Sequence, residues 1–187
     1  MSELSGCGPS GVEGDRHVQA PAVIAILRAR ELSVATAESL TGGLLCAALT
    51  SVPGASTVVR GGIVAYTHQA KEQLLGVDPI LLATRGAIDS QVALAMARGA
   101  RAAYDADVAI ATTGNAGPDP SDGQPVGTVF LALALSPGIR PDLSPGGVIE
   151  ALTLTGTREQ IRADTVRHAL DLLGGVLGAR SGRYGEQ

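Results

Sequence analysis

Apolar positions along the chain follow two spacings, and the change from one to the other predicts an α/β fold. Segments in which apolar residues recur at helical spacing are predicted helices: 18–29, 41–51, 69–75, 79–83, 90–104 and 157–177. Shorter apolar runs between turn-forming residues are predicted strands: 32–36, 58–66, 107–113, 126–135 and 148–155. Helices that alternate with strands predict a single three-layer α/β/α domain around a mixed sheet of about five to six strands.

The boundaries of this predicted domain follow from turn and tail signals. The last two strands are separated only by a proline- and glycine-rich loop, 136–147, so we expect them to pair antiparallel. Asp89 precedes an alanine-rich segment and is a predicted helix N-cap. Residues 1–17 and 179–187 lack apolar periodicity and are predicted to be disordered tails, which leaves 18–178 as the domain.

Composition narrows the classes of protein to consider. Hydrophobic residues make up 45% of the 187 and aromatic residues only 2%, so aliphatic side chains must fill the core. The formal net charge is -4 without a basic run, which gives no reason to expect nucleic-acid or membrane binding. Cys7 and Cys46 are too few for a disulfide framework or a paired-cysteine metal site. Neither a signal-peptide pattern nor an apolar run of ~20 residues is present, so we expect a cytoplasmic location.

The turn Thr36-Ala37-Glu38-Ser39-Leu40-Thr41-Gly42-Gly43 joins a predicted strand to a predicted helix. Backbone N–H groups at a helix start are unpaired and favour an anion or an oxyanion. Ser39 is therefore a candidate nucleophile. The alternative is that Ser39 or Thr41 only caps the helix.

A serine nucleophile needs a base, and the chain offers two candidates. Lys71 is the only lysine in the sequence, and a desolvated lysine can lose its proton. His68 follows a predicted strand end and is the other candidate. Lys71 is equally compatible with an exposed position on its helix, so the residues alone leave both bases open.

Two further segments contain ligand-binding chemistry. The glycine-rich loop 114–124 follows a predicted strand, where α/β folds place ligands. Arg158 and Arg162 lie at the start of the last predicted helix, where a cation opposes the helix dipole. These arginines need an acceptor, and a phosphate is one that they bind well.

Several stretches together resemble one family. The segments TAESLTGGLLCAALTSVPGAS, RGGIVAYTHQAKEQLLGV, GNAGP followed by PVGTVFLALA, and GTREQIR stand in the order seen in the CinA carboxy-terminal domain family. The resemblance covers residues 18–177. That family includes nicotinamide-nucleotide amidohydrolases, which implies hydrolysis of the carboxamide of nicotinamide mononucleotide to nicotinate mononucleotide and ammonia, without a metal or organic cofactor.

The resemblance also implies roles for individual residues. The family serine falls on Ser39, and the tyrosine and lysine of its A-Y-x-x-x-x-K segment fall on Tyr66 and Lys71, which makes these three the expected catalytic residues. With the serine as nucleophile, the amides of Thr41–Gly43 would stabilise the oxyanion. The expected substrate-binding residues are Thr41, Gly42, Gly43, Thr113, Gly114, Arg158 and Arg162.

The chain departs from the family pattern at three places, and the departures at Asn115 and Thr157 support an alternative function. Asn115 stands where the family carries an apolar residue, Thr157 replaces the acidic residue of G-D-R, and Asp89-Ser90 replaces S-E. The alternative is a regulatory module that binds a pyridine nucleotide without turnover. In either case the expected partner is a small nucleotide, and a homodimer is plausible. Many family members have an additional amino-terminal domain, and we expect this short chain to be the stand-alone form.

Overall fold

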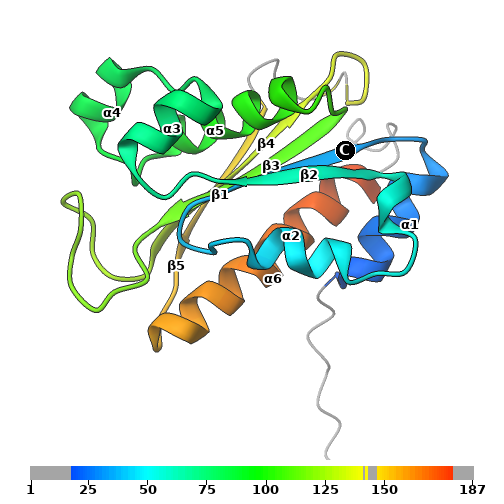
Figure 1. Cartoon of the computed structure of the whole chain (residues 1–187). Coiled ribbons are helices and arrows are strands. Elements are labelled where there is room, and N and C mark those ends of the chain that lie inside the picture. The colour runs from blue at the N-terminus through cyan, green and yellow to red at the C-terminus, as the bar shows by residue number, and fades with distance from the viewer. Residues whose placement is uncertain (1–17, 141, 143–146, 179–187) are drawn as a thin grey trace, which may run out of the picture.

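The computed structural model describes residues 18–140, 142 and 147–178 (Figure 1). Its strands are β1 (Val34–Glu38), β2 (Val59–Val64), β3 (Val108–Gly114), β4 (Thr128–Leu135) and β5 (Val148–Thr153). Its helices are α1 (Ala20–Ala29), α2 (Leu44–Thr50), α3 (His68–Leu75), α4 (Pro79–Arg85), α5 (Ser90–Ala103) and α6 (Arg158–Gly178), with a 3₁₀ turn at Ala55–Thr57. The predicted tails 1–17 and 179–187 lie outside the described residues, as do 141 and 143–146 of the predicted loop.

The strands form a mixed sheet in the order β2-β1-β3-β4-β5 among the described residues. β1 runs parallel to both β2 and β3. β4 pairs antiparallel with β3 and with β5, so the antiparallel pairing expected for the last two strands is confirmed. The three-layer prediction is confirmed as well, because α1, α2 and α6 cover one face and α3, α4 and α5 cover the other (Figure 1).

The two faces of the sheet carry side chains of different size. Alternate strand positions bear larger aliphatic side chains and pack against α1, α2 and α6: Val34, Val108, Ile110, Val129, Leu131 and Leu133. The intervening positions bear alanine and pack under α5: Ala35, Ala37, Ala109, Ala111, Ala132 and Ala134. Successive strand residues point to opposite faces, so two consecutive residues at the end of a strand face the two different helical layers.

Close packing on the alanine face fixes the position of α3. A Cβ atom added to Gly99 of α5 would lie 2.0 Å from the carbonyl oxygen of Leu75, so only glycine lets the end of α3 approach this closely. α3 begins at an N-cap, Thr67, whose side chain accepts a hydrogen bond from the amide of Ala70. Both ends of the short helix that carries Lys71 are thus fixed.

β1 and β3 lie at the point where the chain direction around the sheet reverses. From β1 the chain crosses to β2 through α2, and from β2 it returns to β3 through α3, α4 and α5 on the opposite face. Ligands of open α/β sheets bind in the crevice outside the carboxyl ends of strands at such a point. Ser39 follows β1 there, and Asn115 follows β3.

Candidate active site

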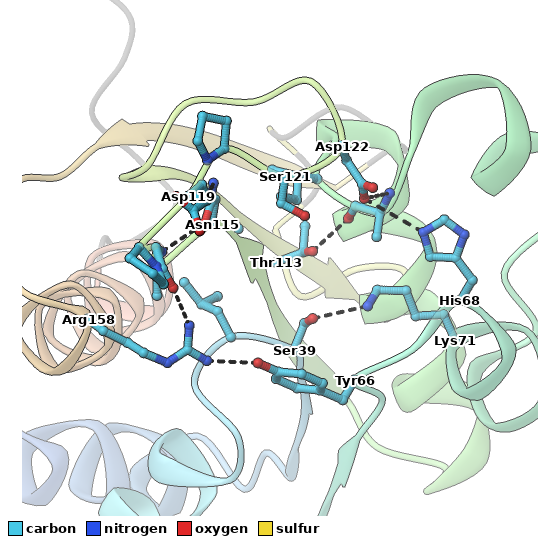
Figure 2. A pocket seen from close by; sticks show the side chains of 18 residues that line it. Ser39, Tyr66, His68, Lys71, Thr113, Asn115, Asp119, Ser121, Asp122 and Arg158 are labelled. Atoms are coloured by element: carbon cyan, nitrogen blue, oxygen red, sulfur yellow. Dashed lines mark hydrogen bonds and ion pairs between the residues drawn. The ribbon is translucent and has the colours of Figure 1, made fainter.

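A pocket of about 450 Å³ opens at this edge of the sheet. This volume lies in the range of small-molecule sites. The pocket is lined by the turn after β1 (Ser39, Leu40), by Tyr66, His68 and Lys71, by Ala87 and Ile88, by residues 113–122, and by Arg158 (Figure 2).

Ser39 and Lys71 meet at the base of this pocket. Ser39 continues the alanine-bearing face of β1, which turns its side chain toward α3. The ammonium Nζ of Lys71 donates a hydrogen bond to Ser39 Oγ at 3.0 Å (Figure 2). It donates another to the carbonyl oxygen of Ala65 at 3.0 Å. Lys71 has no exposed surface, and Ser39 is 8% exposed.

Burial lowers the pKa of Lys71 to about 8, because desolvation penalises the charged ammonium. The carboxylate of Asp122 opposes this effect and raises the pKa. A lysine with such a pKa is partly neutral at physiological pH and can then accept a proton from the serine hydroxyl. Buried lysine and serine in direct contact form the arrangement used in Ser–Lys nucleophilic catalysis.

His68, the other candidate base, lies at the rim. Its side chain is 51% exposed, and its Nε2 atom lies 3.6 Å from a carboxylate oxygen of Asp122. The same oxygen accepts a hydrogen bond from the amide of Ala87 at 2.7 Å. His68 lines the pocket, yet the described contact of Ser39 Oγ is with Lys71.

Tyr66 and Arg158 meet across the mouth of the pocket. Arg158, the first residue of α6, donates from Nη2 to the Tyr66 hydroxyl at 2.8 Å and from Nη1 to the carbonyl oxygen of Gly117 at 2.7 Å (Figure 2). A guanidinium has five N–H donors, so these contacts leave donors for an anionic ligand. The favourable acceptors also explain why a cation stands at this helix start.

The loop after β3 forms the opposite wall and is held by Asn115. The side-chain amide of Asn115 donates to the carbonyl oxygens of Asp119 and Gln124 at 2.9 and 3.1 Å. Its Oδ1 accepts from the amide of Gly117 at 2.8 Å. Thr113 lines the pocket, and its hydroxyl donates to the carbonyl oxygen of Ala87 at 2.6 Å. Gly114 lines the pocket beside it.

Thr41, Gly42, Gly43 and Arg162 are not among the residues that line this pocket. The Thr41 hydroxyl is buried against the Thr112 hydroxyl at 2.8 Å, on the face away from Ser39. The amide of Gly42 donates to the Ser39 carbonyl oxygen at 3.1 Å. Arg162 donates to the carbonyl oxygens of Leu40 and Thr41, each at 2.9 Å. These groups hold the turn instead of facing the ligand space.

Glu38, which the sequence did not single out, binds the amides at the end of the turn and at the start of α2. Its carboxylate accepts from the amide of Gly43 at 2.9 Å and lies on the α2 side of the sheet. Strand alternation is the signal that could have found it, because Glu38 and Ser39 must point to opposite faces.

The fold agrees with comparisons with known proteins. Residues 17–177 match the CinA C-terminal domain family. The chain belongs to this family. It is 47% identical over 151 residues to a CinA-like protein of Frankia casuarinae, covering 81% of this chain and 33% of that protein. A CinA-like protein of Geobacter sulfurreducens is 45% identical over 162 residues, which cover 86% of this chain and 37% of that protein. The chain thus spans about a third of the length of these curated relatives.

Solved structures of the CinA superfamily have the same fold. One from Klebsiella pneumoniae has a TM-score of 0.78 at 32% identity and covers 85% of this chain and 95% of its own. The competence/damage inducible protein CihA of Agrobacterium tumefaciens has a TM-score of 0.75 at 40% identity, covering 84% of this chain and 92% of its own.

The departures from the CinA pattern have structural explanations. Thr157 and Gln160 form a reciprocal capping box on α6: the Thr157 amide donates to Gln160 Oε1 at 2.7 Å, and the Gln160 amide donates to Thr157 Oγ1 at 3.3 Å. Asp89 accepts from the amides of Gln91 and Val92, which confirms it as the N-cap of α5. Asn115 holds its own loop. None of these three residues replaces a group of the Ser39–Lys71 pair.

Two features are absent from the described residues. In that part of the chain, no three His, Cys, Asp or Glu side chains are grouped as a metal site requires. Among the same residues, none of the helices combines the length and apolar character needed to cross a bilayer.

Proposed function

We propose that the chain hydrolyses the carboxamide of nicotinamide mononucleotide, giving nicotinate mononucleotide and ammonia. One observation carries the proposal: a fully buried lysine, whose pKa is lowered to about 8, contacts a serine hydroxyl at 3.0 Å inside a pocket. This pair has the chemistry of an activated nucleophile. The family resemblance supplies the amide substrate.

In the proposed acylation step, neutral Lys71 accepts the hydroxyl proton as Ser39 Oγ attacks the amide carbon. The tetrahedral intermediate collapses when the C–N bond breaks, and the Lys71 ammonium gives its proton to the nitrogen, which leaves as ammonia. Water then attacks the resulting ester and passes a proton to Lys71. The nicotinate carboxylate and the Ser39 hydroxyl are regenerated.

The oxyanion of this intermediate needs N–H donors that the turn has not already used. Gly42 and Gly43 donate within the turn, to Ser39 and Glu38. The amides of Leu40 and Thr41 have no acceptor among the described residues, and of these two residues Leu40 lines the pocket. We therefore assign the oxyanion to the Leu40 amide, next to the nucleophile, in place of Gly42 and Gly43.

The substrate's phosphate fits the rim better than the turn. Arg158 lines the pocket and keeps donors beyond those given to Tyr66 and Gly117. Its planar guanidinium suits a phosphate. Because Lys71 contacts Ser39 directly, a proton relay through Tyr66 is unnecessary, and we assign Tyr66 with Arg158 to substrate binding.

Ammonia release from nicotinamide mononucleotide, measured with a coupled assay and by separation of the two nucleotides, tests the proposal. The wild type should turn over, and Ser39→Ala and Lys71→Met should lose ~10⁴-fold or more in kcat, because the nucleophile and its base act as a unit. A wild type that binds the nucleotide by calorimetry but forms no product would support the regulatory module instead. Full activity in Ser39→Ala would exclude Ser39 as the nucleophile.

A further inference from the structure

A buried carboxylate beside the nucleophile takes no part in the proposed reaction. Glu38 is the last residue of β1, and only 1% of it is exposed. Its carboxylate accepts from the amides of Gly43 and Leu45 at 2.9 and 3.0 Å. It also accepts from the amide of Cys46 at 2.8 Å and from the hydroxyl of Thr36 at 3.2 Å. Both oxygens are thus directed to the start of α2, and Glu38 does not line the pocket.

The backbone of Glu38 joins the two halves of the catalytic pair. Its carbonyl oxygen accepts from the amide of Ala65 at 2.9 Å. The carbonyl oxygen of Ala65 in turn accepts from Lys71 Nζ at 3.0 Å. On the other side, the amide of Ser39 donates to the carbonyl oxygen of Thr112 at 2.9 Å. A shift of the chain at Glu38 would therefore move Ser39 relative to Lys71.

The turn that follows is held at opposite ends by opposite charges. Glu38 accepts from amides on its helical side, and Arg162 donates to the carbonyl oxygens of Leu40 and Thr41. N-cap residue Gly43 has no side-chain acceptor of its own, so Glu38 supplies the carboxylate that satisfies the first amides of α2.

We propose that Glu38 is a positioning residue, whose buried carboxylate fixes the turn after β1 so that Ser39 Oγ is held against Lys71. The inference rests on the proposed Ser39 chemistry. A negative charge with acceptors on both oxygens is required, because each oxygen of Glu38 receives two donors. Glutamine has the same shape, but its NH₂ group would face backbone N–H donors that it cannot accept from.

The test compares Glu38→Gln with Glu38→Asp and with a matched loss of a helix cap elsewhere. Asp78 caps α4 by accepting from the amide of Ile80 at 2.8 Å and lies outside the pocket lining, so Asp78→Ala is the control. Loss of one cap should lower the melting temperature by roughly 2–4 °C without changing kcat. Glu38→Gln should lower kcat by about 10²-fold with KM within about threefold, since a displacement of ~1 Å costs about that factor. Glu38→Asp, which keeps both acceptors, should recover part of kcat.

Labelling of Ser39 by a fluorophosphonate separates failure of this inference from failure of the proposed substrate. Glu38→Gln should label about 10²-fold more slowly than the wild type, whereas Asp78→Ala should label at the wild-type rate. Wild type that labels but releases no ammonia refutes the substrate and leaves the labelling comparison valid. Equal labelling of wild type and Glu38→Gln, or a kcat loss equal to that of Asp78→Ala, would overturn the positioning role. A wild type that neither labels nor hydrolyses has no activated Ser39, which overturns both proposals.

Discussion

Activity should rise with pH through the pKa of Lys71, because only its neutral amine can accept the proton of Ser39. Burial lowers that pKa from 10.5 to about 8. At pH 7 a group with this pKa is ~10% neutral, against ~0.03% for an unshifted lysine, a difference of about 300-fold in active enzyme. The ascending limb of kcat/KM should therefore have its midpoint near pH 8.

Asp122→Asn should change the midpoint of the ascending limb of kcat/KM. The Asp122 carboxylate raises the pKa of Lys71, so its removal should move the midpoint to lower pH. Asparagine fits the position, because Asp122 has a φ of 48°, a conformation that asparagine tolerates. An asparagine oxygen can also accept from the Ala87 amide, as Asp122 does at 2.7 Å.

The assay is kcat/KM for ammonia release from pH 5.5 to 9.5, for the wild type, Asp122→Asn and His68→Gln. His68→Gln is the control that separates the two candidate bases, since a histidine base would place the limb near ~6.5. We expect its limb to persist, with a midpoint moved only slightly because the imidazole lies beside Asp122. Loss of the limb in His68→Gln, or a wild-type midpoint near that of a free lysine, would refute Lys71 as the base.

Substitutions at Lys71, Thr157 and Asn115 test the energetics of burial, of helix capping and of the loop after β3. Lys71→Met should abolish activity yet raise the free energy of unfolding by about 2 kcal/mol below pH 8. The lowered pKa costs about 3 kcal/mol, and the loss of two hydrogen bonds offsets part of the gain. Between pH 8 and 10.5 the unfolded wild type binds more protons than the folded one, so the stability of the wild type rises with pH. The difference in free energy of unfolding between Lys71→Met and the wild type, measured by urea titration, should therefore shrink over this range. A difference that stays constant would contradict the cost of burying the ammonium. Thr157→Ala should lose ~1 kcal/mol and Thr157→Ser should not, measured by thermal unfolding; equal stability would argue against the capping box. Asn115→Ala removes three hydrogen bonds and should lower the free energy of unfolding by ~2–3 kcal/mol. It should also raise KM more than it lowers kcat. An unchanged KM would show that the loop does not shape the pocket.

Element boundaries were predictable because their signals are local. The predicted strand 107–113 and the observed β3, Val108–Gly114, differ by one residue at each end. The predicted helix 41–51 is observed as Leu44–Thr50, beginning later because residues 39–43 form the turn. Spacing of apolar residues and the turn residues between them carry this information without reference to distant segments.

The partners of the polar groups were not predictable in the same way. The sequence indicated the amides of Thr41–Gly43 as oxyanion donors, but in the folded chain the amides of Gly42 and Gly43 donate to the Ser39 carbonyl oxygen and to the Glu38 carboxylate. It offered Arg162 for a phosphate, but the packing of α6 against α2 places this side chain at the carbonyl oxygens of the turn. Which acceptor a donor finds depends on segments that are remote in sequence.

The sequence by itself determined the α/β class, the family and the residue types at the strand ends. Only the tertiary structure decided that Lys71 is fully buried and in contact with Ser39, 32 positions away. The strand order places β1 beside β2 and β3, and Gly99 admits α3 close enough to bring the amine there. The pKa of Lys71 is lowered because burial removes water from its ammonium group. This burial depends on all the segments packed around Lys71, so the residues next to it in the sequence do not predict it.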